Sequence, residues 1–284
     1  MKTPPRIAPL VEDGLVDAVV RQLKSGKEAT VYLVRRGEEI LCAKVYKDAN
    51  QRSFRQAVQY REGRKVRSSR LARAMEKGSK FGREEQQAHW QNAEVSALYC
   101  LAAAGVRVPR PYGCYDGVLL MELICDEEGA VAGRLADFDF TAEQAREFHH
   151  RLIREVVRML CAGLVHGDLS EFNILVDPDG PVIIDLPQAV DAAANNHAKA
   201  MLERDVGNLA TFFGQFAPEL LDSDYAAEIW DIYERGDLTP QTMLTGEFAH
   251  DETPADVDDL LRQIQDAIAE EAARKAREAA GDEA

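Results

Sequence analysis

The sequence lacks the features that would place a protein in or beyond a membrane. Among its 284 residues, no apolar run reaches the roughly 18 residues of a membrane-spanning helix. The opening MKTPPRIAPL contains no apolar segment of the kind that directs secretion. Cysteine is scarce, odd in number and never at metal-ligand spacing, which predicts reduced thiols that pack as small buried apolar groups: Cys42, Cys100, Cys114, Cys125 and Cys161. We therefore expect a cytoplasmic protein without a membrane partner.

Positive charge is also in short supply, except in one segment. The net charge of −15 argues against broad nucleic-acid binding, so no DNA partner is expected. Residues 51–85, however, hold eleven Lys or Arg against four Asp or Glu, a local surplus of seven positive charges. Taking this +7 from the total of −15 leaves −22 for the rest of the chain. The basic segment could contact phosphate, a ribosomal precursor, RNA or an acidic protein, or it could be a solvated insertion.

The first part of the chain reads as a β-rich unit. VYLV and ILCAKVY are rich in β-branched and aromatic residues, and RRGEE lies between them, which predicts an antiparallel hairpin. A loop that contains one glycine, SGKEAT, precedes this hairpin. Residues 86–104 are predicted to form a helix that ends at Gly105. VLLMELI, at 118–124, is predicted to be a strand that is apolar except for Glu122.

The second part of the chain is rich in helical patterns. Thr141 begins a predicted helix with one apolar stripe, and this helix ends at Gly163. Two short strands then flank the DPDG turn, and residues 192–236 are predicted to be helical. A charged, alanine-rich helix is predicted at 254–284. A β-rich part followed by a helical part favours two lobes with a cleft between them.

The stretch LVHGDLSEFNILV, residues 164–176, sets polar groups between apolar strands. Asp168 and Asn173 are five residues apart, and a hairpin would return Asp185, twelve residues further on, to the neighbourhood of Asn173. Such oxygen ligands suit Mg²⁺ with a phosphate-bearing substrate. The spacing is that of a kinase catalytic loop and its metal-binding aspartate, with Asp168 receiving or orienting the proton of the acceptor. Each residue alone would more often form a turn or a cap, but the combination predicts a phosphotransferase.

A phosphotransferase also needs groups in the other lobe that hold the nucleotide. Lys44, in ILCAKVY, can reach the α- and β-phosphates and pair with Glu94 of the predicted helix. VLLMELI would lead to the adenine, with Met121 lining the pocket and the backbone of Glu122 and Ile124 bonding the purine edge. A plain buried strand explains its apolar residues equally well. The loop before the hairpin takes the place of a phosphate-covering loop: Ser25, Gly26, Lys27, Glu28, Ala29, Thr30 and Val31.

Several of these segments together resemble the RIO family of atypical protein kinases. They are SGKEATVY, CAKVYK, LVHGDLSEFNILV and IIDLPQAV, and ERDVGNLATFF is similar to the helix that follows in that family. The resemblance covers about residues 20–235 and is to the subfamily without a winged-helix domain, in a prokaryotic-type form. It implies an α+β, two-lobed, protein-kinase-like fold. The N-lobe would span 1–124, a reduced helical C-lobe 125–250, and a peripheral charged tail 251–284.

The resemblance also implies ligands and roles. The ligands would be ATP and Mg²⁺, with Mn²⁺ as a substitute, and the activity would be serine phosphorylation that includes self-phosphorylation. A slow ATPase that phosphorylates its own Asp185 is a second form of activity in the family. Asp168 would be the catalytic base, Asn173 and Asp185 the metal ligands, and Lys44 the phosphate-binding lysine. Candidates for self-phosphorylation stand in the basic segment: Ser68, Ser69 and Ser79.

Some positions depart from ordinary protein kinases. Gly167 stands where HRD kinases have the arginine that reads a phosphorylated activation loop, so control of that kind is not expected. Ser170 replaces a lysine often found two residues after the catalytic aspartate, which leaves one positive charge less near the γ-phosphate. Asp205 is expected to accept hydrogen bonds from the catalytic-loop backbone. The triplet APE at 217–219 resembles the end of an activation segment, but we interpret it as coincidence, with Pro218 breaking a helix.

Three functions are compatible with these residues. The first is a RIO-type serine kinase that acts on protein. The second is an ATP-gated assembly factor, for example on ribosomal precursors, and the third is a small-molecule phosphotransferase of the aminoglycoside-kinase type, which shares HGDL…N. SGKEAT, DLPQA and the small C-lobe speak against the third. The first and second need the same site, so the sequence leaves both open.

Overall fold

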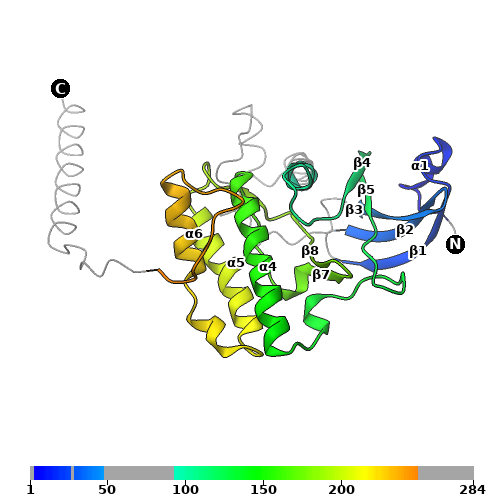
Figure 1. Ribbon diagram of the computed structural model, residues 1–284. Coiled ribbons are helices and arrows are strands. Elements are labelled where there is room, and N and C mark those ends of the chain that lie inside the picture. The colour runs from blue at the N-terminus through cyan, green and yellow to red at the C-terminus, as the bar shows by residue number, and fades with distance from the viewer. Residues whose placement is uncertain (1–2, 27–28, 48–92, 249–284) are drawn as a thin grey trace, which may run out of the picture. The chain divides into compact units, whose positions relative to one another are not determined.

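The computed structural model describes residues 3–26, 29–47 and 93–248 (Figure 1). The described residues up to Glu247 belong to one compact unit. The predicted terminal helix and the basic segment with its three serines lie outside the described residues. The predicted lobe boundaries therefore stay predictions. None of the described helices is long and apolar enough to cross a membrane.

A five-stranded antiparallel sheet, preceded by the short helix α1 (Ala8–Glu12), forms the first part of the compact unit. Its strand order is β1-β2-β3-β5-β4. The strands are β1 (Ala18–Ser25), β2 (Ala29–Arg36), β3 (Glu39–Tyr46), β4 (Pro111–Tyr115) and β5 (Val118–Glu122). The predicted hairpin is confirmed as β2 and β3, which pair from Ala29↔Tyr46 to Arg36↔Glu39.

The alternation of side chains along β3 sets up the site. Successive residues of a strand point to opposite faces of the sheet. Ala43 and Val45 pack with Ile7 and Leu10 in the apolar cluster on one face. Tyr46 belongs to the main core on the other face, and Lys44 points to that same face by the alternation.

A helix that includes residues 93–103 packs against this second face of the sheet. Leu98 and Leu101 are buried there together with Leu119 of β5. The chain leaves the helix through Gly105, whose φ of +75° lies in the left-handed region that glycine adopts readily. The described part of the helix predicted at 86–104 is thus confirmed.

The second part of the unit is mainly helical (Figure 1). Its longer helices α4, α5 and α6 pack against one another, and small strand pairs β6–β9 and β7–β8 lie in the connections. The elements are η3 (Leu135–Asp137), α4 (Ala142–Cys161), β6 (Leu164–Val165), η4 (Glu171–Asn173), β7 (Ile174–Asp177), β8 (Gly180–Ile183), β9 (Val190–Asp191), α5 (Ala198–Phe213), η5 (Pro218–Asp222) and α6 (Tyr225–Glu234).

Thr141 caps the N-terminus of α4, as the sequence predicts for the start of this helix. Its hydroxyl accepts a hydrogen bond from the Gln144 N–H at 3.2 Å, and the Gln144 side chain accepts one from the Thr141 N–H at 2.9 Å. This reciprocal pair satisfies two backbone donors that the first turn leaves unpaired.

Replacing Thr141 by Ala should therefore destabilise the protein by about 1 kcal/mol, because one of these donors loses its acceptor. Urea unfolding followed by circular dichroism measures the change. Thr211→Ala is the matched control, because Thr211 is an exposed residue inside α5. Alanine favours a helix interior, so this control should be neutral or slightly stabilising. Equal destabilisation in both variants would contradict the role of the cap.

Two expectations from the sequence need correction. Pro218 does not end α5, which stops at Phe213; it begins the separate turn η5, and Glu219 beside it forms an exposed ion pair with Arg146 at 2.6 Å. The cysteines are free, as expected, but only Cys42 is buried. Cys125 is partly buried, and the other three are exposed, since they lie on strand and helix surfaces away from the core.

Candidate functional site

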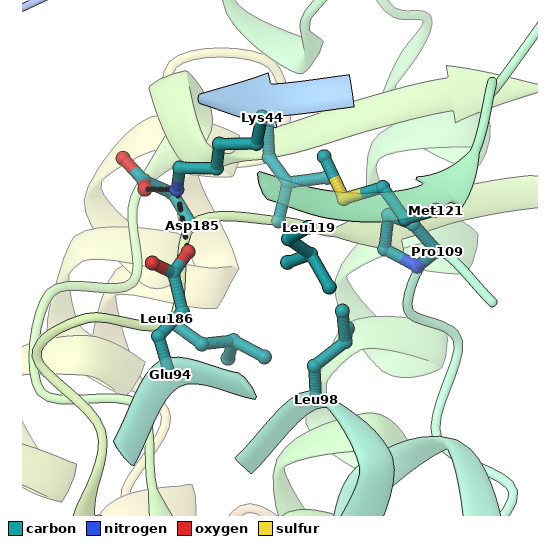
Figure 2. Close-up of a pocket in the computed structure, with 9 residues that line it drawn as sticks. Lys44, Glu94, Leu98, Pro109, Leu119, Met121, Asp185 and Leu186 are labelled. Atoms are coloured by element: carbon teal, nitrogen blue, oxygen red, sulfur yellow. Dashed lines mark hydrogen bonds and ion pairs between the residues drawn. The ribbon is translucent and has the colours of Figure 1, made fainter. Parts of the chain in front are cut away.

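Lys44 joins two parts of the compact unit (Figure 2). Its ammonium donates to Oε1 of Glu94 at 2.5 Å and to Oδ1 of Asp185 at 3.0 Å. The side chains of Lys44 and Glu94 are only 12% and 7% exposed, whereas that of Asp185 is 49% exposed. The Lys44 ammonium thus pairs with one buried carboxylate, that of Glu94, and with one accessible carboxylate, that of Asp185.

The ion pairs fix the charges of these groups. Burial acts to lower the pKa of Lys44, but the charges of Glu94 and Asp185 outweigh it and raise the pKa well above its usual value. Burial acts to raise the pKa of Asp185, yet the charge and the hydrogen bond of Lys44 hold it below its ordinary value. Both groups are therefore charged at neutral pH.

Tyr46 is a supporting residue that the sequence analysis missed. Its hydroxyl donates to Oε2 of Glu94 at 2.7 Å, on the carboxylate oxygen that Lys44 does not use. Residues two apart on a strand share a face, so the pattern K-x-Y in CAKVYK could have suggested the contact. Tyr46 is 3% exposed, and its ring packs in the main hydrophobic core. It thereby keeps Glu94 in the position that Lys44 needs.

Tyr46→Phe should destabilise the protein by about 1.5–3 kcal/mol, because it removes a buried hydrogen bond to a charged group and keeps the ring. Thermal and urea unfolding measure this change. Tyr115→Phe is the control, since Tyr115 is 37% exposed and its loss of a hydroxyl should have little effect. A Tyr46→Phe protein as stable as the control would show that the hydroxyl does not hold Glu94.

A small pocket, partly open to solvent, lies around these charges. Figure 2 shows Lys44, Glu94 and Asp185 on one side of it, with apolar side chains on the others. The lining residues are Lys44, Glu94, Leu98, Pro109, Leu119, Met121, Ile184, Asp185 and Leu186. Met121 thus lines the pocket, as the sequence predicts.

The backbone after β5 offers polar groups next to this pocket. Glu122 uses its N–H to bond the Arg110 carbonyl at 2.9 Å, and the Ile124 carbonyl accepts from Ala132 at 3.0 Å. The Ile124 N–H makes no backbone hydrogen bond to a described residue. The predicted roles of Glu122 and Ile124 stay predictions.

The predicted phosphate loop connects β1 to β2. Gly26 donates its N–H to the Ala29 carbonyl at 2.9 Å, and the hydroxyls of Ser25 and Thr30 lie 3.3 Å apart. Val31, the next residue of β2, pairs with Lys44 across the sheet, so the loop leads directly to the lysine. The remaining predicted loop residues, Lys27 and Glu28, lie outside the described residues.

Asp168 and Asn173 lie on the loop that contains η4. The amide nitrogen of Asn173 donates to the Asp168 carbonyl at 2.8 Å. β7 then starts at Ile174, which pairs with Ile183 of β8, and Ile184 donates to the Asn173 carbonyl at 2.9 Å. The hairpin thus returns the chain to Asn173 immediately before Asp185, and this prediction is confirmed.

The charge distribution at Asp168 differs from that at Asp185. Asp168 is an exposed residue, but its carboxyl group is partly buried, and this partial burial raises its pKa. The charge of Arg204 opposes the rise, and the charge of Asp185 adds to it.

Among the described residues, no group of three or more His, Cys, Asp or Glu could hold a metal by itself. Asn173 and Asp185 instead offer an amide oxygen and a carboxylate, which would suit Mg²⁺, since this ion binds through few protein ligands and takes others from phosphate and water.

His166 holds the two halves of the site together. It is 2% exposed, its Nε2 lies 3.2 Å from the Ile184 carbonyl, and its Nδ1 accepts from the Asp168 N–H at 3.3 Å. Nε2 therefore carries the hydrogen. Burial lowers the pKa of His166 to about 4, so the ring is neutral at physiological pH. It serves as a fixed spacer between the loop of Asp168 and the segment of Asp185.

The backbone at Asp185 is itself unusual. Its φ of +67° lies in the left-handed region, which a residue other than glycine seldom adopts. Such a conformation is retained only where surrounding contacts impose it, and it is found most often at functional sites. It turns the Asp185 side chain toward Lys44 directly after β8.

Asp205 has the role that the sequence predicts. From α5, it accepts hydrogen bonds from the Gly167 N–H at 2.7 Å and the Leu169 N–H at 2.9 Å, and it is 1% exposed. Two neighbours of Asp205 on α5, Arg204 and Asn208, bond the same loop and were missed.

Arg134 is another cation that the sequence analysis missed. It forms an isolated bridge with Leu175 of β7, and its charge contributes to lowering the pKa of Asp185. No local motif marks this arginine, because it enters the site through pairing with a strand 41 positions later in the chain.

Comparison with known proteins assigns this site to a family. A family model described as the RIO domain matches residues 30–226. A RIO-type serine/threonine-protein kinase Rio1 of Haloferax volcanii is 35% identical over 233 residues, which cover 80% of this chain and 74% of the relative. The serine/threonine-protein kinase rio1 of Schizosaccharomyces pombe is 27% identical over 215 residues, but the match spans only 40% of that protein.

A solved structure supports the fold. The Rio2 kinase of Chaetomium thermophilum, described as an ADP/Mg²⁺-phosphoaspartate complex, matches with a TM-score of 0.52 and 19% identity. The match covers 81% of this chain and 74% of the other. It confirms the predicted α+β, kinase-like fold, with a β-rich first part and a helical second part. With the family model matching most of the chain, this protein belongs to the RIO family of kinases.

Proposed function

We propose that this protein is an ATP- and Mg²⁺-dependent phosphotransferase that acts as a RIO-type serine/threonine protein kinase. The observation that carries the proposal is the pairing of Lys44 with both Glu94 and Asp185. Protein kinases need a strand lysine paired with a helix glutamate and a metal-binding aspartate in place at the same time. The named relatives are serine/threonine kinases, which supports the same activity.

The residues have complementary roles in this proposal. Lys44 would bind the α- and β-phosphates, and the loop from Ser25 to Val31 would cover them. Met121 and the backbone of Glu122 and Ile124 would bind adenine. Asp168 is accessible, and hydrogen bonds to the backbone of its loop hold it in place. It can therefore orient the acceptor hydroxyl and receive its proton.

Asn173 and Asp185 would hold the metal. Their donor set of an amide oxygen and a carboxylate matches the preference of Mg²⁺ for oxygen. Bound Mg²⁺ would neutralise the charge that develops on the phosphates during transfer. Mn²⁺, with similar ligand preferences, stays a predicted substitute.

A second form of the activity is favoured by one observation. The related Rio2 structure is described as containing phosphoaspartate. In this chain the corresponding proposal is that Asp185 takes the γ-phosphoryl group of ATP, with an acyl phosphate forming and ADP leaving. Hydrolysis of that acyl phosphate would make the protein an ATPase. An assembly partner, such as a ribosomal precursor, and a location in the cytoplasm also stay predictions.

The test is incubation of the full chain with γ-labelled ATP, with Mg²⁺ and after its removal by a chelator. Label should enter the protein only with the metal. Acid-stable label would identify phosphoserine or phosphothreonine, and label released by hydroxylamine would identify an acyl phosphate. Folded protein that binds ATP but neither becomes labelled nor releases phosphate would overturn the proposal.

A further inference from the structure

Three side chains of α5 hold the backbone on both sides of Asp168. Asp205 accepts from the N–H groups of Gly167 and Leu169 at 2.7 and 2.9 Å. Asn208 donates to the Leu169 carbonyl at 2.9 Å, and a guanidinium nitrogen of Arg204 donates to the Gly167 carbonyl. Both polar backbone groups of the residue before Asp168, and both of the residue after it, are thus bonded to one helix.

The position of Arg204 matters because the loop itself has no cation. Gly167 and Ser170 occupy the places where ordinary protein kinases carry an arginine and a lysine. Arg204 comes from a helix 36 residues further along the chain, yet its charge acts on Asp168. Asp205, its neighbour, is buried and occupied with the loop N–H groups. The contact at the Gly167 carbonyl brings the guanidinium to the residue directly before Asp168.

We propose that Arg204 is a positioning residue for Asp168, and that it supplies from α5 the positive charge that the catalytic loop lacks. The proposal rests on the proposed phosphotransferase function. Its physical basis is geometric. The charge-assisted hydrogen bond of the guanidinium to the Gly167 carbonyl restricts the orientation of the Asp168 backbone, and a neutral donor would hold it less strongly.

Conservative variants separate the charge from the hydrogen bond. Arg204→Gln keeps a donor but loses the charge, and Arg204→Lys keeps both in a shorter form. We expect Arg204→Gln to lower kcat about 10- to 100-fold, with KM for ATP and ATP affinity within about three-fold of the native protein. Arg204→Lys should recover most of the loss. Arg204 is exposed, so these variants should fold.

Two further variants control for general effects. Arg146→Gln makes the same substitution at an exposed arginine of α4 that pairs with Glu219, and it should leave kcat unchanged. Asn208→Ala removes a loop hydrogen bond without changing charge, and it should lower kcat less than Arg204→Gln does. Addition of guanidinium chloride at low millimolar concentration to Arg204→Ala should restore part of kcat, whereas sodium chloride should not.

The outcomes are distinguishable. Arg204→Gln with native kcat, or losses of the same size in Arg204→Gln, Arg204→Lys and Asn208→Ala, would overturn the inference. The same holds if guanidinium fails to rescue an Arg204→Ala protein that still binds ATP. A native protein that binds ATP but transfers no phosphoryl group would overturn the proposed function instead, since no kcat would exist to compare.

Discussion

Replacement of Asp168 by Asn should lower kcat for phosphoryl transfer about 10²- to 10⁴-fold. The amide has nearly the same shape as the carboxylate but cannot take a proton from the acceptor hydroxyl. The backbone contacts of the loop run through the N–H and carbonyl groups of Gly167 and Leu169, so they should survive. ATP binding should stay within about two-fold of the native value, because the nucleotide is held by other residues.

The measurement compares initial rates of transfer and the Kd for ATP in the native protein and the variant. Asp222→Asn is the matched control, because Asp222 is an exposed aspartate at the end of η5. It should have native kcat. If Asp168→Asn keeps more than about a tenth of the native kcat, Asp168 is not the proton acceptor.

Replacement of Lys44 by Met should have two large effects. It removes the cation that faces the phosphates, and loss of such a preorganised group lowers kcat about 10²- to 10³-fold. It also leaves the carboxylates of Glu94 and Asp185 facing each other without a counter-charge. Breaking a buried pair costs about 3–5 kcal/mol. The loss of stability should be near 3 kcal/mol, because Asp185 is half exposed and Tyr46 still bonds Glu94.

Urea unfolding and ATP titration of the Lys44→Met protein measure these effects. Lys199→Met is the control, because Lys199 is exposed on α5 and should tolerate the change. A double variant, Lys44→Met with Glu94→Gln, should regain part of the lost stability but no activity. If the single variant is as stable as the control, the contacts of Lys44 serve the nucleotide alone and do not stabilise the fold.

Much of the local structure could be predicted because neighbours in the sequence decide it. The β-branched and aromatic residues of VYLV and ILCAKVY, with the turn RRGEE between them, predicted β2 and β3, and Thr141 predicted the start of α4. The turn in DPDG fixed the β7–β8 register, which is why the proximity of Asn173 to Asp185 could be expected. The burial of the cysteines was predicted less well, since burial depends on which face of an element meets the core.

The sequence by itself determined the family pattern and the types of residues at the site. The order of HGDLSEFN, the later Asp185 and the strand lysine is a property of the chain, and the RIO domain match rests on such patterns. Only the tertiary structure decided that Tyr46 holds Glu94, that Arg134 lies beside β7, and that Arg204 bonds the catalytic loop. These contacts join residues 37 to 48 positions apart, which no local periodicity relates. They form only when the packing of the sheet and α5 brings those side chains to one place.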